Sequence, residues 1–157
     1  MIPRYTLPEM GAIWTDEARM RAWLQVEVAA VRAWSTLGKV PPEAVAEIEA
    51  KADFDAARVA EIEKTTDHDV IAFLTNVAEH VGPASRHVHE GLTSSDVVDT
   101  GLALQMTQAA DILIALRNQR LEITNATIEE PSLDDVFMAL TGHPKETPVA
   151  ENGARNS

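Results

Sequence analysis

The segment Thr66-Asp67-His68-Asp69 places a histidine between two carboxylates. An imidazole can donate or accept a proton near neutral pH, and a neighbouring carboxylate can orient the ring. The segment therefore fits a general acid or base. The alternative interpretation is a solvated histidine that lies close to a helix N-cap.

A second candidate site is the run His87-Val88-His89-Glu90-Gly91-Leu92-Thr93-Ser94-Ser95-Asp96. Gly91 permits a tight loop, and three hydroxyl residues follow at an expected helix start. Free backbone N–H groups and hydroxyls at a helix N-terminus form an anion site, suited to a carboxylate or a phosphate. An ordinary helix cap needs only Thr93 and Asp96. Two interpretations therefore stay open, an anion site and a helix cap without a ligand.

A third candidate is Arg4-Tyr5 near the N-terminus. A guanidinium offers a fork of donors to a phosphate, and a phenol adds one hydroxyl. A surface arginine beside a packing tyrosine is the alternative, because chain termini often carry no function.

Metal and phosphate-loop signatures are absent from the sequence. His87 and His89 are two residues apart, but no HExxH or Cys/His array accompanies them. Neither GxGxxG nor GxxxxGKS occurs. We therefore expect no metal site and no glycine-rich phosphate loop.

The segments that carry these candidate residues, and those between them, have apolar residues at helical spacing. We expect helices over 15–37, from Pro41 to about residue 52, over about 55–64, from His68 to Val81, and over about 95–121, with a polar loop over 85–94. Thr93 followed by Asp96 resembles a capping box. The predicted inward residues of the last helix are Val98, Leu102, Ala109, Ile112, Leu113 and Leu116.

Composition limits the classes of function. The 157 residues carry a formal net charge of −12 and contain no cysteine. This charge opposes binding to nucleic acid or to an anionic membrane, although a small anion can still bind locally. No secretory signal or membrane-spanning run is present in the sequence. We expect a cytoplasmic protein without disulfides.

Three separated segments resemble bacterial adenylosuccinate lyase, a family of the fumarase/aspartase superfamily. They read MIPRYTLPEMGAIWTDEARMRAWLQVEVAAVRAW, IEKTTDHDVIAFL and HVHEGLTSSDVVDT, in the order and spacing of that family. The resemblance covers about residues 1–120. It implies a β-elimination that releases fumarate from adenylosuccinate, and from the related succinyl intermediate of purine synthesis, without a cofactor.

The resemblance also implies roles for individual residues. Arg4 and Tyr5 would contact the nucleotide phosphate, and Thr93 and Ser94 would bind a carboxylate of the succinyl group. The other implied site residues are catalytic His68 and His89, and substrate-binding Asp69.

The sequence departs from the family at several points. Asp67 and Glu90 replace residue types that are more usual there, and a carboxylate at 67 would repel an anionic substrate. The family's second and third active-site regions, which supply another histidine and a serine loop, are not found here. Since the family builds its site from three subunits of a homotetramer, we expect this chain to supply only the first region and to be inactive alone.

Residues from about 122 have a different character. Residues 121–128 could form a short strand, a brief helix is expected at about 133–141, and the polar remainder predicts disorder. Residues of about 122–143 resemble the C-terminal end of an ABC transporter ATP-binding subunit, without its ATP-contacting motifs. This resemblance suggests a fusion near residues 116–122.

The sequence thus predicts an all-α fold, with a truncated lyase-like helical domain over 1–121 and a foreign tail over 122–157. The expected function is an adenylosuccinate-lyase-type C–N lyase acting on a nucleotide substrate, and we expect the chain to self-associate. The alternatives are a non-catalytic helical remnant or interaction module, and an accessory piece derived from an ABC transporter.

Overall fold

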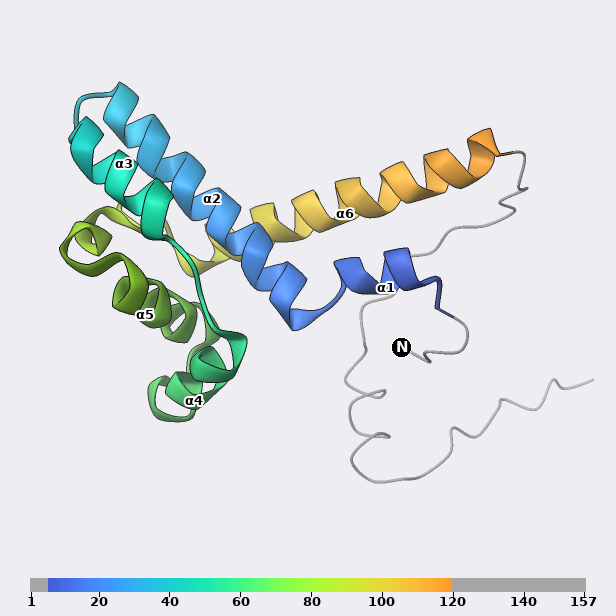
Figure 1. Cartoon of the computed structure of the whole chain (residues 1–157), viewed down its shortest axis with the longest axis horizontal. Helices are drawn as coiled ribbons and strands as arrows, with labels where there is room; N and C mark the ends of the chain where they lie inside the picture. Colours follow the sequence, from blue (N-terminus) through green and yellow to red (C-terminus); the bar gives the residue numbers. More distant parts are fainter. Residues whose placement is uncertain (1–5, 120–157) are drawn as a thin grey trace, which may run out of the picture. The chain divides into compact units, whose positions relative to one another are not determined.

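A computed structural model describes residues 6–119, which lie within one compact unit, Met1–Glu122. Every regular element in this part of the chain is a helix, so the predicted all-α class is confirmed. Figure 1 shows α6 extending away from the group formed by α2 to α5, with α1 beside it. The elements are α1 (Pro8–Ile13), α2 (Asp16–Thr36), α3 (Pro42–Lys51), α4 (Ala56–Thr66), α5 (Asp69–Val81), the 3₁₀ helix η2 (Gly82–His87) and α6 (Ser94–Asn118).

Helix α2 packs against α1, α3, α4 and α6. Its buried apolar residues include Met20, Trp23, Leu24 and Val31. These positions recur at helical spacing and form one continuous stripe. Glu27 lies on the same stripe and is also fully buried, which the sequence analysis did not predict.

Three aromatic rings form the centre of the core. The Phe73 ring of α5 makes edge-to-face contacts with Trp23 and with Phe54, each with a centroid separation of 5.6 Å. Such pairs add about 0.5–1.5 kcal/mol beyond the burial of their area. They join α2, α5 and the connection before α4.

A polar network joins α4 to α5. Asn76 is buried, accepts a hydrogen bond from the Asp55 backbone N–H at 2.8 Å and donates one to Glu79 at 2.9 Å. Glu79 also receives two hydrogen bonds from Arg58. These contacts lower the pKa of Glu79 to about 2, and the hydrogen bonds from Arg58 have the largest effect. The network therefore fixes the start of α4 against the body of α5.

Local signals place several helix ends as predicted. Thr15 caps α2 by accepting from the Ala18 N–H, and Asp55 caps α4. Gly82 ends α5 with a φ of +79°, a conformation that glycine adopts without strain. The predicted polar loop over 85–94 is partly wrong, because its beginning forms the last turn of η2.

The buried face of α6 differs from the predicted one. Val97, Gly101 and Gln105 point inward, because the α2 indole needs the space that only glycine leaves. A Cβ on Gly101 would lie 2.7 Å from Trp23 Cδ1, and Gln105 donates to the Ile13 carbonyl at 2.6 Å. None of the residues predicted as the buried stripe is fully buried. Leu102 is exposed, and the others are half-buried, with Val98 packed against the core: Val98, Ala109, Ile112, Leu113 and Leu116.

Predictions beyond residue 119 lie outside the described residues. They are the possible strand at 121–128, the helix at 133–141 and the disordered tail, so the boundary at 121 stays a prediction. Within the described helices, none has the length and apolar character needed to cross a membrane.

The approach of Gly101 to Trp23 makes a testable prediction. We expect Gly101→Ala to lower the free energy of unfolding by about 1–2 kcal/mol, because overpacking outweighs the better helix propensity of alanine. Urea denaturation measures the change. Thr100→Ala, which places an alanine at the neighbouring exposed position, is the control. Equal stability of the two variants would contradict the close contact.

Candidate functional site

His68 is the N-cap residue of α5. Its Nδ1 lies 3.5 Å from the Ile71 backbone nitrogen, in the direction of a capping acceptor. The Nδ1 of His68 thus faces the start of its own helix, and its Nε2 faces Ser94 of α6. The side chain is 44% exposed.

The start of α6 forms the capping box that the sequence predicts. Thr93 Oγ1 accepts from the Asp96 N–H at 3.4 Å, and the Asp96 carboxylate accepts from the Thr93 N–H at 2.7 Å. This backbone contact is the largest cause of the lowered pKa of Asp96, followed by the Thr93 hydroxyl. The hydroxyl of Thr93 is thus engaged in capping.

Ser94 brings α6 to the histidine of α5. Its Oγ lies 3.5 Å from His68 Nε2, across 26 residues of sequence. The N-termini of two helices thereby meet at one place, where unpaired N–H groups and the helix dipoles favour a negative charge. The fold thus brings together two of the candidate residues, His68 and Ser94.

His89 lies in the connection between α5 and α6 and contacts α2. Its Nδ1 lies 2.6 Å from Oε1 of Glu27, and its backbone has a φ of +67°. The Trp34 indole N–H donates to the Glu90 carbonyl at 2.6 Å, and Trp34 also packs against Gly91. The turn that carries His89 is therefore anchored to α2.

The remaining predicted site residues have simpler surroundings. Asp69 Oδ1 accepts from the Val70 N–H and lies 3.4 Å from His68 Nδ1. Asp67 ends α4 with a φ of +49°, a conformation that aspartate tolerates better than most residues. Arg4 and Tyr5 lie outside the described residues.

Glu27 is the residue of this region that the sequence analysis missed. The available signal was an acidic residue in the middle of an apolar stripe, between Leu24 and Val31. A carboxylate at such a position needs a partner, because desolvation of an unpaired charge is expensive. The structure identifies that partner as His89.

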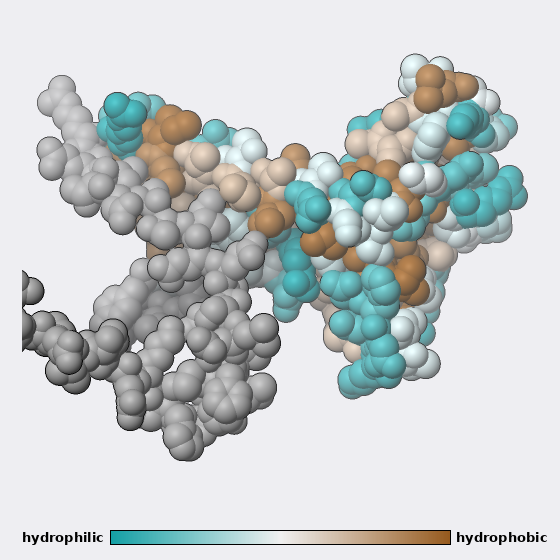
Figure 2. All heavy atoms as spheres, turned by 180° about the vertical axis from the view of Figure 1, so that it is seen from behind, coloured by the Kyte–Doolittle hydropathy of each residue, from teal (hydrophilic) through white to brown (hydrophobic). Residues whose placement is uncertain are grey.

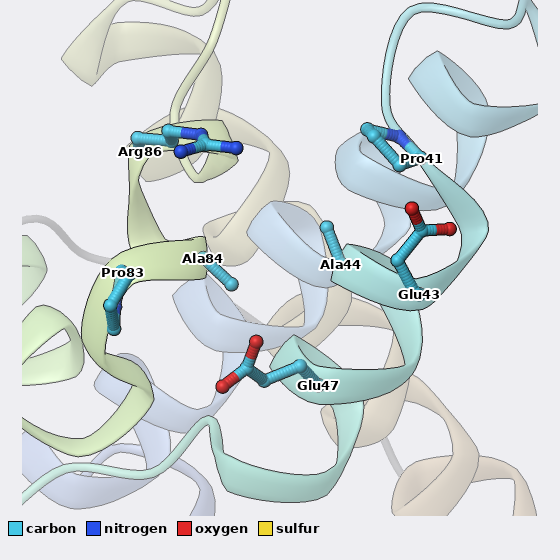
Figure 3. Close-up of a pocket in the computed structure, with 7 residues that line it drawn as sticks. All are labelled: Pro41, Glu43, Ala44, Glu47, Pro83, Ala84 and Arg86. Carbon is cyan, nitrogen blue, oxygen red and sulfur yellow. The ribbon is translucent and has the colours of Figure 1, made fainter.

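A separate hollow of about 220 Å³ lies between α3 and η2 (Figure 3). Arg86 and the carboxylates of Glu43 and Glu47 border it, and neither His68, His89 nor Ser94 contributes to its wall. Within the described residues, no group of three or more His, Cys, Asp or Glu side chains is arranged to hold a metal ion. The candidate site is therefore a surface built on two helix starts.

The sequence profile of a family described as "Lyase" matches residues 4–139. The chain belongs to this lyase family. Within it, the chain is homologous to the N-terminal region of adenylosuccinate lyase. The adenylosuccinate lyase of Synechocystis sp. is 59% identical over 114 residues, covering 73% of this chain and 26% of that protein. The adenylosuccinate lyase of Bacillus subtilis is 54% identical over 142 residues, covering 90% and 32% respectively.

Solved structures agree on the fold. The 3-carboxy-cis,cis-muconate lactonizing enzyme of Pseudomonas putida superposes with a TM-score of 0.65 at 36% identity, over 71% of this chain and 27% of that one. A fumarate lyase from Mesorhizobium sp. BNC1 has the same fold, with a TM-score of 0.60 at 24% identity, over 71% of this chain and 26% of that one. The chain spans about a quarter to a third of the length of the curated relatives given above.

The two hydroxyls at the start of α6 should differ in their effect on stability. We expect Thr93→Ala to lower the free energy of unfolding by about 1 kcal/mol, because it removes the cap. Ser94→Ala should change the free energy of unfolding by less than about 0.5 kcal/mol. Thr93→Ser keeps a capping hydroxyl and should retain most of the stability. Chemical denaturation measures all three. An equally large loss from Ser94→Ala would assign that hydroxyl to the fold instead of to a ligand.

Proposed function

We propose that this chain supplies one wall of an adenylosuccinate-lyase-type active site. The reaction is the elimination of fumarate from adenylosuccinate and from the related succinyl intermediate of purine synthesis. The meeting of His68 and Ser94 at two helix N-termini is the observation that carries the proposal. The identity of 54–59% with adenylosuccinate lyases supports it.

Each residue has a role that suits its surroundings. The elimination needs a base for the proton beside a carboxylate and an acid for the leaving nitrogen. We assign His68 to one of these two proton transfers, because a half-exposed imidazole can donate or accept a proton near neutral pH. Ser94 would bind a succinyl carboxylate together with the free N–H groups of α6. Thr93 would contribute mainly by holding that helix start, since its hydroxyl caps α6.

The other assignments rest on the family resemblance. Arg4 and Tyr5 would bind the nucleotide phosphate, as a guanidinium fork and a phenol can. Asp69 would contact the substrate beside His68, and His89 would be the second histidine of the site. The proposed reaction uses no cofactor, and residues of this chain or of a partner carry its proton transfers.

The proposed wall is open to solvent. The side chains of His68 and Asp69 are 44% and 46% exposed. A substrate held on such a surface loses much of the positioning that an enclosed site provides, which can amount to about 7–11 kcal/mol. We therefore propose that the chain alone lacks measurable activity and that further lyase segments must complete the site.

The test of this proposal is fumarate release from adenylosuccinate by the purified chain. We expect no turnover above background, and weak adenylosuccinate binding that His68→Ala and Ser94→Ala reduce, as isothermal titration calorimetry would measure. Thr107→Ala, at an exposed position of α6, is the matched control. Turnover close to that of an ordinary lyase, abolished by His68→Ala, would show that the chain is a working enzyme.

A helical interaction module is the second candidate, and the exposed face of α6 favours it. Leu102, Met106 and Ile114 are 36%, 40% and 56% exposed on this helix. Figure 2 shows hydrophobic surface over its projecting part. Contiguous exposed apolar surface is typical of an interaction site. Because the family implied by the sequence is tetrameric, we propose a second copy of this chain or a related lyase as the partner.

Sedimentation velocity tests this interaction. We expect the chain to self-associate with rising concentration and Ile114→Glu combined with Met106→Glu to shift it towards the monomer, because charge opposes burial. Leu37→Glu changes a 68% exposed leucine at the end of α2 and should have no such effect. A monomeric wild-type chain at high concentration would argue against the module.

The origin of residues 122–157 is a further part of the proposal. The resemblance to the end of an ABC transporter ATP-binding subunit implies a foreign tail from residue 122, whereas we propose that lyase sequence continues to about residue 139. The lyase family match includes residues 122–139 and so favours a continuous lyase segment up to there. An accessory role in transport has no support among the described residues.

A further inference from the structure

Glu27 is fully buried in the middle of α2, on the stripe that also carries Trp23 and Val31. Its Oε1 lies 2.6 Å from His89 Nδ1, and its Oε2 is buried with no hydrogen-bond partner among the described residues. An apolar residue would pack at this position without a desolvation penalty, and replacing buried ion pairs by apolar residues is often neutral or stabilising. The contact with His89 therefore calls for a reason beyond stability.

The electrostatics of Glu27 reflect two opposing effects. Burial raises the pKa of this carboxyl, and the hydrogen bond and charge of His89 lower it, with burial the larger effect. A hydrogen bond from an imidazole N–H to the carboxylate is the contact that compensates the buried charge. Its length of 2.6 Å is short for a bond between nitrogen and oxygen, and bonds to a charged partner are shorter than neutral ones.

The backbone holds His89 in place from the other side. Its left-handed φ of +67° is uncommon for a residue with a side chain. The Leu92 N–H donates to the His89 carbonyl at 3.3 Å, and Trp34 binds the next carbonyl along the chain. Backbone and carboxylate together fix one position of the ring, whose side chain remains 20% exposed.

We propose that Glu27 is a positioning residue that holds His89 as the Nδ1–H tautomer and leaves Nε2 as the acceptor for a ligand. That the ligand is adenylosuccinate rests on the proposed function, whereas the tautomer does not.

The tautomer is measurable in the full chain by ring nitrogen NMR. We would label the protein with ¹⁵N, assign the His89 ring with His89→Gln, and record Nδ1 and Nε2 shifts at a pH where the ring is neutral. The expected result is a protonated Nδ1 and an unprotonated Nε2. A ring protonated at Nε2, or a mixture of tautomers in the wild type, would overturn the inference before any further variant is made.

Variants of Glu27 then test the cause. Glu27→Met keeps the size of the side chain and removes both oxygens, so it should give a mixture of tautomers while circular dichroism shows an intact fold. Glu27→Gln keeps an acceptor oxygen and should retain most of the Nδ1–H form even if the methionine variant fails to fold. Glu90→Gln, which removes the neighbouring exposed carboxylate, is the control and should change nothing. An unchanged tautomer in a folded Glu27→Met variant would overturn the inference.

The same NMR measurement with adenylosuccinate added tests the proposed function separately from the tautomer of His89. A shift confined to the Nε2 signal of His89 would support both. Unchanged His89 signals at saturating adenylosuccinate would contradict the proposed function and leave the role of Glu27 in setting the tautomer supported by the measurements without ligand.

Discussion

The contact of Trp23 with Gly101 is the constraint on which the described structure depends. Trp23 is almost fully buried, packs on Phe73 of α5 and lies where a Cβ of residue 101 in α6 would be. One indole therefore sets the separation of α2 from both helices whose starts form the candidate site. Since helices are stiff, fixing their bodies also fixes their N-termini, and His68 and Ser94 meet there as a consequence.

The buried polar side chains work alongside this apolar packing. Gln105 binds the carbonyl of Ile13, Asn76 binds the backbone of Asp55, and Glu27 binds the ring of His89. Each joins a helix body to a connecting or terminal segment, where hydrophobic contact alone is non-directional. A buried polar group is costly without a hydrogen-bond partner. Each of these contacts therefore favours one arrangement of the helices over others that would bury a similar apolar area.

The helix starts of the candidate site carry a local field that differs in sign from the net charge of the chain. The formal net charge is −12, yet His68 and Ser94 lie at two helix N-termini, whose N–H groups carry partial positive charge. Helix-end fields fall off within about one turn and are strongest where water is partly excluded. An acidic protein can therefore present a local anion site, provided that the donors are fixed in place and the acidic residues nearby are engaged. Asp96 meets this condition, because its carboxylate is held by Thr93.

Short-range features of the sequence determined much of the structure. Thr93 and Asp96 predicted the capping box, because this signal acts within a single turn of backbone. Helical periodicity, which also acts over a few residues, predicted the helices over 15–37 and from His68 to Val81.

Contacts between residues far apart in the sequence were decided by tertiary packing. The apolar side chains of α6 predicted the wrong buried face, because the contact with Trp23 needed the small side of the helix and left Leu102 outside. The pairing of Glu27 with His89 joins residues 62 positions apart, and no local pattern specifies which distant side chain meets a buried charge. Only the folded arrangement of α2 against the start of α6 makes that choice.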